Sequence, residues 1–394
     1  MSKKSPQLRF KGFTDAWEER KVGNFLSESK IKGSDGSVSK KLTVKLWRKG
    51  IVPKEEIYKG SSATQYYIRL AGQFMYGKLD FLNQAFGILP NELDGYESTL
   101  DSPAFDFKDG INPNFFLEYV CQENFYKYQG NIANGSRKAK RIHADTFFDM
   151  PITIPSFEEQ EKIGSFFKQL DKTIALHQRK LDLLKEQKKG YLQKMFPKNG
   201  AKVPELRFAG FADDWEERKL KDIAQFNPKT VLPDEFEYVD LESVVGTEMI
   251  SHRTESKDQA PSRAQRLAQK GDVFYQTVRP YQMNNYLYDL PYDNYVFSTG
   301  YAQMRPNIDS YFLLNSVQNK QFVQHVLDRS TGTSYPAINS SDLSNIEIHV
   351  PSKLSEQQKI GAFFQSIDDT IALHQHKLDL LKEQKKGFLQ KMFV

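Results

Sequence analysis

The sequence predicts a mixed α/β protein in which two globular domains are joined by two long antiparallel helices that form a coiled-coil rod. The strongest observation is an internal repeat: residues 159–196 return as residues 356–393 with roughly four positions in five unchanged. A shorter segment, PQLRFKGFTDAWEERK, returns as PELRFAGFADDWEERK at residues 204–219. The stretches between the repeated segments barely resemble each other. A duplicated frame around two different inserts predicts two similar units, related by an approximate two-fold axis, that act on two different targets.

Length and composition are those of a soluble protein with two ordinary cores. The chain has 394 residues, of which 39% are hydrophobic and 27% are charged. No stretch stays apolar for the roughly 18 residues that a membrane span needs, and the first residues lack the apolar core of a signal peptide, so we expect a cytoplasmic protein. Cys121 is the only cysteine, which excludes an internal disulfide and a cysteine-built zinc site. The formal net charge of +5 is weak evidence for nucleic acid, because much of the surplus lies in the first long repeat.

Each long repeat is predicted to be a single helix that follows a strand. Aliphatic residues alternate with other residues before the proline that precedes each repeat, which is typical of a half-buried strand. Ser156 with Glu159, and Ser355 with Gln358, match the capping box at the start of a helix. Proline and glycine then end the first helix. In chain order, the predicted first globular domain, first long helix, linker, second globular domain and second long helix are residues 1–155, 156–196, 197–203, 204–351 and 352–394.

The spacing inside each helix alternates between four and three residues, which predicts a coiled-coil seam. A rod of this length with one apolar stripe needs a partner helix, and its own repeat is the obvious candidate. The seam residues are Ile163, Phe167, Leu170, Ile174, His177, Leu181, Leu184, Ile360, Phe364, Ile367, Ile371, His374, Leu378 and Leu381. A symmetric antiparallel pairing predicts that Ile174 and His177 lie within about one turn of Ile371 and His374.

A second apolar stripe lies off the seam of each helix. Because one helical partner cannot cover two stripes, we expect further helices from another subunit to dock there. The stripe consists of Phe166, Leu176, Leu183, Leu192, Phe363, Leu373, Leu380 and Leu389.

The repeated motifs resemble the DNA-specificity subunit of type I restriction-modification enzymes. The resemblance covers essentially the whole chain and is carried by IPSFEEQEKIGSFFKQLDKTI, by VPSKLSEQQKIGAFFQSIDDTI, by the two WEERK openings and by the two LDLLKEQKKGxLQKMF endings. It implies that each insert is a target recognition domain that reads one half of a split, asymmetric site in double-stranded DNA. It also implies that the helical rod sets the spacing and binds two methyltransferase subunits, through which restriction subunits are recruited.

The same resemblance implies that this chain is not itself an enzyme and holds no cofactor. S-adenosylmethionine, ATP and Mg²⁺ would belong to the partner subunits, which carry out DNA methylation and restriction. The sequence agrees, because it contains no amino-methyltransferase N-P-P-[YF] motif and no phosphate-binding G-x-x-x-x-G-K-[ST] loop. Asp234 with Glu255 and Lys257 has the spacing of a Mg²⁺-dependent nuclease site, but so short a pattern arises easily by chance and occurs in only one insert. We therefore expect neither catalytic nor metal-binding residues.

Candidate DNA-binding residues fall in equivalent places of the two inserts. Aligned on the strand and proline that follow, NGSRKAKRI in the first insert lies opposite TGTSYPAIN in the second. A glycine turn and polar loop also recur, at residues 72–87 and 271–286, with amide and cationic groups suited to base edges. The candidates in these loops are Lys78, Asn83, Gln84, Ser136, Arg137, Lys138, Lys140, Arg141, Arg279, Tyr281, Gln282, Asn284, Asn285, Thr333, Ser334 and Tyr335.

Two further basic groups are candidates for phosphate contacts. Such groups are more often solvated surface than binding site. The stretch that carries the second group is polar and rich in glutamine, and its strand or helix periodicity is too weak to anchor base readout, so we expect contacts with phosphate. The first group is Lys40, Lys41, Lys45 and Arg48, and the second is Arg253, Lys257, Arg263 and Arg266.

A sequence-specific regulator that acts without partner subunits is the main alternative function. Such a protein would need no second protein on its rod, so its long helices should be polar away from the seam. The second apolar stripe favours the multi-subunit interpretation instead.

Overall fold

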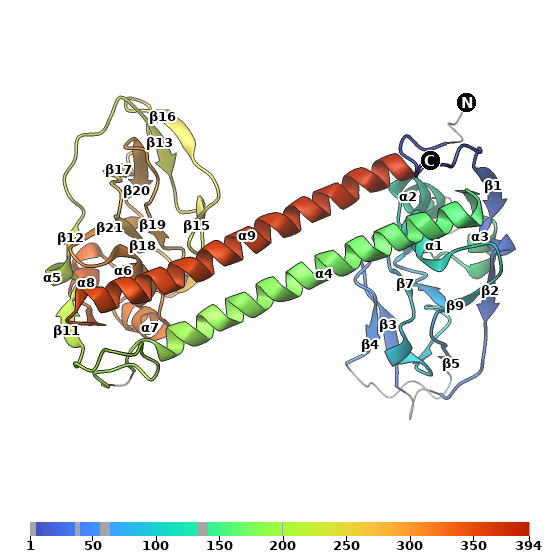
Figure 1. Cartoon of the computed structure of the whole chain (residues 1–394), viewed down its shortest axis with the longest axis horizontal. Coiled ribbons are helices and arrows are strands. Elements are labelled where there is room, and N and C mark those ends of the chain that lie inside the picture. The colour runs from blue at the N-terminus through green and yellow to red at the C-terminus, as the bar shows by residue number, and fades with distance from the viewer. Residues whose placement is uncertain (1–4, 36–39, 56–63, 132–140, 199, 394) are drawn as a thin grey trace. The chain divides into compact units, whose positions relative to one another are not determined.

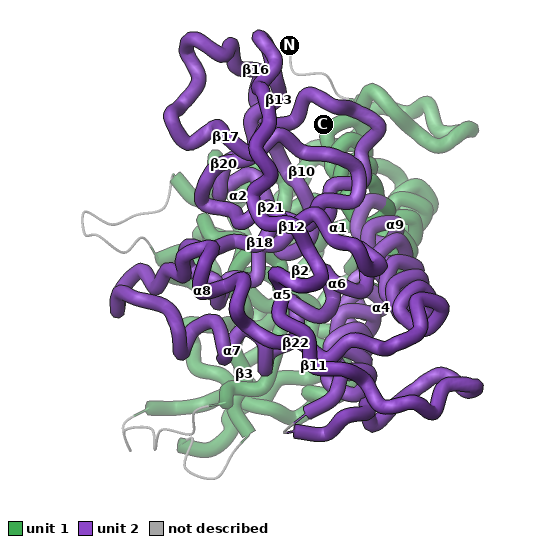
Figure 2. Tube along the Cα trace, turned by 90° about the vertical axis from the view of Figure 1, so that its left-hand side faces the viewer, with its two compact units in different colours: residues 1–177, 377–394 green, residues 178–376 purple. Residues whose placement is uncertain are grey.

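The computed structural model describes residues 5–35, 40–55, 64–131, 141–198 and 200–393. The chain forms two compact units: unit 1 is Met1–His177 with Lys377–Val394, and unit 2 is Gln178–His376 (Figure 2). The two long helices, α4 (Phe157–Lys194) and α9 (Leu354–Met392), are each divided near the middle, so each unit contains part of both (Figure 1). Among the helices that the structure describes, none combines the length and apolar character that crossing a bilayer requires.

Unit 1 is a mixed α/β unit built around a sheet of order β2-β9-β6-β7. A separate antiparallel pair, β1 with β10, joins the two ends of the insert. Its helices are α1 (Pro113–Val120), α2 (Glu123–Asn131) and α3 (Ala144–Phe148), and its 3-10 turns are η1 (Val22–Asn24), η2 (Phe81–Asn83) and η3 (Asn91–Leu93). Its strands are β1 (Glu18–Lys21), β2 (Leu26–Ser29), β3 (Leu42–Val44), β4 (Ile51–Pro53), β5 (Tyr67–Ile68), β6 (Phe74–Tyr76), β7 (Phe86–Ile88), β8 (Glu97–Ser98), β9 (Ala104–Phe107) and β10 (Pro151–Ile154).

Unit 2 repeats this topology with a sheet of order β12-β21-β18-β19 and the joining pair β11 with β22, and adds a second sheet of order β16-β13-β20-β17. Its helices and 3-10 turn are α5 (Leu220–Ile223), α6 (Ser310–Val317), α7 (Lys320–Asp328), α8 (Ser340–Ser344) and η4 (Pro280–Gln282). Its strands are β11 (Glu216–Lys219), β12 (Ala224–Phe226), β13 (Glu235–Val239), β14 (Val244–Val245), β15 (Glu248–Met249), β16 (Arg253–Ser256), β17 (Ala264–Leu267), β18 (Val273–Gln276), β19 (Tyr286–Leu287), β20 (Tyr295–Ser298), β21 (Tyr301–Pro306) and β22 (Glu347–Val350).

The second sheet of unit 2 corrects one expectation. The basic stretch that starts at Arg253 was predicted to have only weak strand or helix periodicity, yet β16 lies in it and β17 follows at Ala264–Leu267. β16 pairs with β13 at the edge of the sheet, and three of its four residues are exposed. An exposed edge strand has no apolar alternation, which is why its sequence carries no strand signal.

The start of each long helix is held by a buried arginine–glutamate pair. Glu159 accepts hydrogen bonds from Arg9 Nε at 2.8 Å and from Arg9 Nη2 at 2.6 Å. Glu356 accepts from Arg207 Nε at 2.7 Å and from Arg207 Nη2 at 2.9 Å. The repeated opening segment and the repeated helix therefore meet in both units through the same bidentate pair.

The predicted capping boxes are corrected by this arrangement. In the first helix the Glu159 N–H does donate to Ser156 Oγ at 3.4 Å, but the Glu159 carboxylate binds Arg9 instead of turning back. In the second helix the box is wrong, because α9 begins at Leu354 and Ser355 lies inside it. A carboxylate binds a guanidinium more strongly than it binds a backbone N–H, which explains why Glu159 binds Arg9.

The glutamine and glycine of the repeated helix motif lock each helix onto its insert. Gln160 accepts a hydrogen bond from the Asn112 N–H at 3.0 Å, and Gln357 accepts from the Asp309 N–H at 3.2 Å. A Cβ at Gly164 would collide with Asn112 and with the backbone of α1. At Gly361 a Cβ would collide with Asp309, which caps α6. Glycine is therefore required where the long helix crosses the start of α1 or α6.

The core of each unit is completed by the far end of the other long helix. In unit 1 the ring of Phe393 lies 5.6 Å from Phe115, 5.9 Å from Phe167 and 6.3 Å from Trp17, measured between ring centroids. In unit 2 the ring of Phe196 lies 5.7 Å from Phe312, 6.1 Å from Phe364 and 6.1 Å from Trp215. Aromatic rings at these separations pack as they do in protein cores.

The two long helices run antiparallel within each unit. In unit 1, Phe166 contacts Phe388 while Asp171, five residues later, pairs with Lys385. In unit 2 the equivalent contacts are Tyr191 with Phe363 and Lys188 with Asp368. The partner number falls as the helix number rises, which confirms the predicted antiparallel direction.

Unit 1 also contains a buried cluster of charges where the insert meets both helices. Arg48, from the β3–β4 turn, donates to Glu118 on α1 at 2.6 and 2.7 Å. Lys385 donates to the same carboxylate at 3.3 Å and to Asp171 at 2.5 Å. Burial alone would raise the pKa of Glu118, but Arg48 and Lys385 beside it hold that pKa below its ordinary value.

We predict that Phe393→Ala destabilises the protein by about 3–5 kcal/mol, because it opens a cavity among three aromatic rings. The matched control is Leu176→Ala, since the Leu176 side chain is 67% exposed. Urea denaturation of the full chain measures both. If Leu176→Ala lowered the free energy of unfolding as much as Phe393→Ala, the core formed by both long helices and the insert would be contradicted.

We predict that Glu118→Gln costs about 3–5 kcal/mol at neutral pH, because it leaves Arg48 and Lys385 without their buried counter-ion. Since the pKa of Glu118 is lowered by folding from 4.5, its contribution is present above about pH 4.5 and is lost as the pH falls through the folded value. The difference in melting temperature between wild type and Glu118→Gln should therefore shrink below pH 4.5. The exposed Glu92→Gln serves as control, and a difference independent of pH would rule out this linkage.

Candidate nucleic-acid interface

The two predicted loops of unit 2 lie side by side and form one surface. The Arg279 N–H donates to Pro336 O at 2.7 Å, and the Ile338 N–H donates to Thr277 O at 3.0 Å. Thr331 and Ala337 exchange a pair of backbone hydrogen bonds of 2.9 Å each. These backbone bonds therefore fix two loops, more than 50 residues apart in sequence, beside each other.

Unit 1 joins its equivalent loops in the same way. The Ile142 N–H donates to Lys78 O at 3.1 Å, which corresponds to the bond from Ile338 to Thr277 in unit 2. Of the predicted residues in the first loop, Ser136, Arg137, Lys138 and Lys140 lie outside the described residues. Arg141 is exposed and lies 3.5 Å from Asp101 in an ion pair.

Both units build the second loop from a 3-10 turn followed by a left-handed residue. The turn is η2 in unit 1 and η4 in unit 2, and the residues that follow are Gln84 with φ 51° and Met283 with φ 57°. Left-handed backbone at a residue other than glycine is strained, by about 1 kcal/mol, and persists only where surrounding contacts enforce it. The conformation of the loop is therefore a property of the shared frame, while its side chains differ.

Arg279 is the most exceptional side chain in this surface. Its backbone is left-handed, with φ 54°, and its guanidinium carbon lies 5.4 Å from the centroid of the Tyr335 ring. Its Nε is buried and has no hydrogen-bond partner in the described part of the chain. The Tyr335 side chain is 68% exposed, so the pair reaches the surface. A stacked guanidinium with free donors is suited to a planar acceptor pair, such as a base edge or a phosphate.

The amides of the same loop are used to hold it together. Gln282 Oε1 accepts from Gln276 at 2.9 Å, and Asn284 Oδ1 accepts from the Gly246 N–H at 2.9 Å. Asn285 is 1% exposed and accepts from the Gln276 N–H at 2.8 Å. Of the five residues predicted in this loop, Tyr281 and Gln282 are exposed, Arg279 and Asn284 are half-buried, and Asn285 is buried. Thr333, Ser334 and Tyr335 of the neighbouring loop are exposed.

The candidates of unit 1 separate into buried and exposed groups. Lys78 is buried, and burial lowers its pKa. Lys41 is buried against the Tyr66 ring, and Arg48 lies in the charge cluster. Asn83 donates to Asp80 at 3.2 Å, and Gln84 is the left-handed residue of the turn. Lys40 and Lys45 remain exposed and can meet a phosphate.

The predicted phosphate-binding residues of unit 2 also differ from one another. Arg253 bonds Asp240 and Glu255 at 2.7 Å each and lies 4.7 Å from the Tyr238 ring, so its charge is already compensated. Lys257 and Arg263 are exposed. Arg266 is half-buried, and burial lowers its pKa.

Two residues at this interface carry no clear signal in the sequence. Trp47 is 56% exposed in a left-handed turn, and its N–H donates to Asn83 O at 2.8 Å. A tryptophan in a sequence is normally assigned to a core, although its basic neighbours in KLWRKG are a hint. Asp80 occupies the position of Arg279 in unit 1, because each residue directly precedes the 3-10 turn. The alignment of residues 72–87 with residues 271–286 already pairs Asp80 with Arg279, and the two 3-10 turns agree with that pairing.

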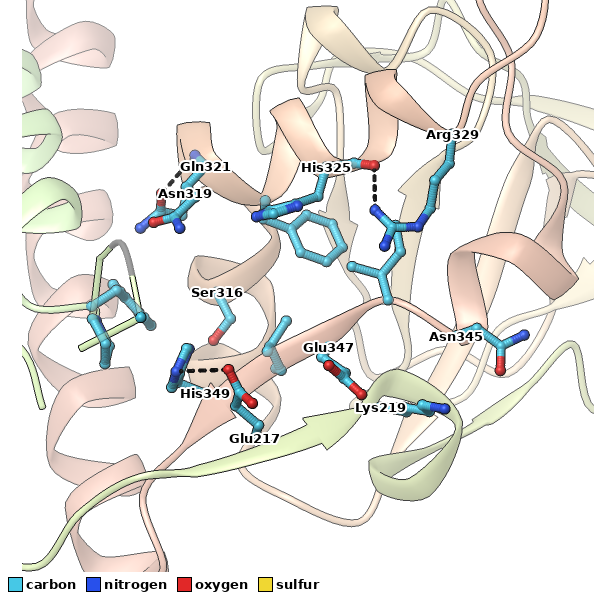
Figure 3. Close-up of a pocket in the computed structure, with 16 residues that line it drawn as sticks. Glu217, Lys219, Ser316, Asn319, Gln321, His325, Arg329, Asn345, Glu347 and His349 are labelled. Carbon is cyan, nitrogen blue, oxygen red and sulfur yellow. Dashed lines mark hydrogen bonds and ion pairs between the residues drawn. The ribbon is translucent and has the colours of Figure 1, made fainter. Parts of the chain in front are cut away.

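A separate pocket of about 420 Å³ in unit 2 shows no arrangement for catalysis (Figure 3). It is lined by His325 on α7, by Arg329 directly after α7, and by Glu217 and His349 on the β11–β22 pair, with 3.4 Å between His349 Nε2 and Glu217 Oε1. The Ser316 hydroxyl in its wall donates to Phe312 O at 2.8 Å. None of the residues predicted to contact DNA lines this pocket.

The short nuclease-like pattern does not form a carboxylate cluster. Glu255 accepts from Arg253 Nε, and Lys257 donates its backbone N–H to Asp234 O at 2.8 Å. Within the described residues, no group of three or more His, Cys, Asp or Glu side chains could hold a metal ion. Burial raises the pKa of the Cys121 thiol to about 12, so this thiol stays protonated at neutral pH.

Known proteins resemble this chain in sequence and in fold. Residues 104–186 and 212–383 match the family model described as type I restriction modification DNA specificity domain. The type I restriction enzyme HindI specificity subunit of Haemophilus influenzae is 25% identical over 196 residues, which are 46% of this chain and 41% of that protein. The MjaVIII specificity subunit of Methanocaldococcus jannaschii is 24% identical over 302 residues, which are 72% of this chain and 70% of that protein.

Two solved structures show the same fold at low sequence identity. The S subunit of a type I restriction-modification system from M. genitalium has a TM-score of 0.64, with 13% identity and 99% of each chain covered. A chain from a study of complex assembly and conformational transition of the type I R-M system has a TM-score of 0.51, with 17% identity, 96% of this chain and 97% of that chain covered. The family match covers more than half of the sequence, and it is repeated on both copies of the frame. The chain therefore belongs to the family of type I restriction modification DNA specificity domains.

Proposed function

We propose that this chain is the DNA-specificity subunit of a type I restriction-modification complex, in which each unit reads one half of a bipartite, asymmetric DNA site. The observation that carries the proposal is that an identical frame holds two different loop surfaces. Three features occur in both units: an arginine–glutamate pair, a backbone hydrogen bond between the two loops, and a left-handed residue after the 3-10 turn. The pairs are Arg9–Glu159 and Arg207–Glu356, and the backbone bonds are donated by Ile142 and Ile338. The side chains that the loops present do not recur.

The difference in loop content supports two different half-sites. Unit 2 presents Arg279 stacked on Tyr335, and a bidentate arginine commonly recognises the N7 and O6 acceptors of guanine. Unit 1 has Asp80 at the equivalent position, and a carboxylate accepts hydrogen bonds, for example from the amino group of cytosine. Exposed cations, Lys40 and Lys45 in unit 1 and Lys257 and Arg263 in unit 2, would position the duplex through its phosphates.

The long helices would set the separation of the half-sites and bind two methyltransferase subunits. The docking surface is smaller than the sequence suggested, because Phe166, Leu192, Phe363 and Leu389 pack against the cores of their own units. Four leucines remain 50–67% exposed and form two equivalent pairs, Leu176 with Leu373 and Leu183 with Leu380. Exposed leucines in equivalent repeats favour one partner copy per repeat. Methylation and restriction, with S-adenosylmethionine, ATP and Mg²⁺, would belong to the partner subunits.

We predict that the half-sites can be exchanged independently. Residues 22–150 should be replaced by the first insert of a family member that keeps an acidic residue at the position of Glu118, so that Lys385 of α9 keeps its counter-ion. The swapped subunit should change one half of the methylated motif and leave the other half and the spacing intact. Methylation profiling of cellular DNA measures this, and a simultaneous change in both halves would refute modular reading.

We predict that Arg279→Ala relaxes one base position in one half-site and costs roughly 1–3 kcal/mol of specific binding. The matched control is the exposed Lys257→Ala, which should weaken binding to all sequences and reduce the salt dependence by about one unit. Affinities for single-base variants of the cognate site, measured at several salt concentrations, separate the two effects. An equal loss on cognate and noncognate DNA for Arg279→Ala would exclude base reading.

We predict that the chain alone aggregates and that one copy binds two methyltransferase subunits, because each repeat carries its own pair of exposed leucines. The mass of the purified complex at saturating partner measures the stoichiometry. A ratio of one to one at saturation would be incompatible with equivalent docking surfaces.

A further inference from the structure

A pocket of about 730 Å³ lies in unit 2 between the two long helices and the insert. Its walls are Lys188 of α4, Thr247 of the β14–β15 turn, Met283 and Tyr286 after η4, and Asp368 of α9. The wall is largely apolar, and the exposed lysines at residues 185, 189 and 320 lie at its edge. Of the loop residues predicted to contact DNA, Gln282 lines it, whereas Arg279 and Tyr281 do not.

The shared frame shows what occupies the equivalent place in unit 1. The left-handed Met283 corresponds to Gln84, and the Lys188–Asp368 pair corresponds to the Lys385–Asp171 pair. In unit 1 this place is filled by Arg48. Its N–H donates to Gln84 O at 3.1 Å, and its guanidinium bonds Glu118 and lies 3.8 Å from Asp171.

Unit 2 lacks the arginine but keeps acceptors for one. The turn that approaches its loop is Gly246–Thr247, held by the bond from Gly246 to Asn284, and carries no cation. The neutral Asn315 stands at the position of Glu118 and is 1% exposed, and it does not line the pocket, so the acceptors that face the pocket are carboxylates of α9. Burial raises the pKa of Asp368 although Lys188 lies 2.6 Å away, which indicates an under-neutralised carboxylate. Asp369 adds a second carboxylate to the lining.

We propose that this pocket receives an arginine side chain from the methyltransferase subunit that docks on unit 2. The inference rests on the proposed function and adds the chemistry of the contact. The arginine stem would lie on Met283 and Tyr286, and its guanidinium would reach Asp368 and Asp369, as Arg48 reaches Glu118 and Asp171 in unit 1. The pocket continues onto the docking surface, because Ala372 lines it and the next residue, Leu373, is 66% exposed.

The two docking sites are therefore unequal. Unit 1 supplies its own arginine and binds its partner without this contact, whereas unit 2 takes the arginine from the partner. An arginine built into the pocket of unit 2 should block the docking site on unit 2 and leave the site on unit 1 unaffected.

The test variant is Thr247→Arg, which places a guanidinium in the pocket from the turn equivalent to that of Arg48. The matched control is Val231→Arg, because Val231 is 83% exposed and lies outside the pocket.

The first measurement is the mass of the complex with the methyltransferase subunit and the affinity of each binding step, without DNA. Wild type and Val231→Arg should bind two copies, while Thr247→Arg should bind one tightly and the second at least about tenfold more weakly. Two copies bound by Thr247→Arg with unchanged affinities would overturn the arginine pocket and leave the proposed function intact. Failure of wild type to bind any copy would overturn both.

A second measurement does not depend on how Thr247→Arg folds. A photo-crosslinking benzoylphenylalanine in place of Tyr286, in the otherwise wild-type complex, should capture a methyltransferase peptide that contains an arginine. Mutating that arginine to alanine should weaken the second binding step by about tenfold or more and leave the first unchanged. A captured peptide without arginine, a crosslink to a second copy of this chain or to DNA, or no crosslink would each overturn the inference.

Discussion

The fold depends on one constraint: the end of each long helix completes a core that the start of the other helix began. Phe393 packs among Trp17, Phe115 and Phe167, and Phe196 packs among the equivalent residues of unit 2. Without these rings each insert would expose aromatic surface that nothing else in its own sequence covers. The antiparallel direction follows, because only that direction brings the last turn of one helix beside the first turn of the other. The long helices are therefore part of both cores and are not simple connectors.

The repeated motif is explained by contacts that hold the insert onto this helical frame. Its glutamate binds the arginine of the opening segment, its glutamine binds the backbone before α1 or α6, and its glycine lets the helices cross closely. These contacts use residues outside the loops that face a ligand. The loops can therefore change their side chains without disturbing the frame, as the replacement of Asp80 by Arg279 between the two units illustrates. A protein that must recognise new DNA sequences without refolding needs this separation.

The two units differ most where charge is buried. In unit 1 two cations and two carboxylates neutralise each other around Glu118, so the insert is tied to both helices from within. In unit 2 an asparagine replaces that glutamate, no arginine enters, and a pocket remains. The two copies of the frame thus share their geometry, while unit 1 contains an internal ion pair that unit 2 lacks. The free volume beside the Asp368 and Asp369 carboxylates is where we propose that a partner adds to the structure.

The sequence by itself determined the duplication, the two long helices, their strands and the antiparallel pairing, because helix and strand periods and repeats are local patterns. It also located both pairs of loops, since their distance from the repeated segments is the same. It could not find β16 and β17, whose exposed residues have no apolar alternation, nor the true start of α9, because Ser355 only imitates a cap. Which of these side chains reach solvent was decided only by tertiary structure: Lys78 and Asn285 are buried, Arg279 is half-buried beside the exposed Tyr335, and Trp47 is exposed. Burial depends on contacts between segments far apart in sequence, and side-chain type alone does not carry that information.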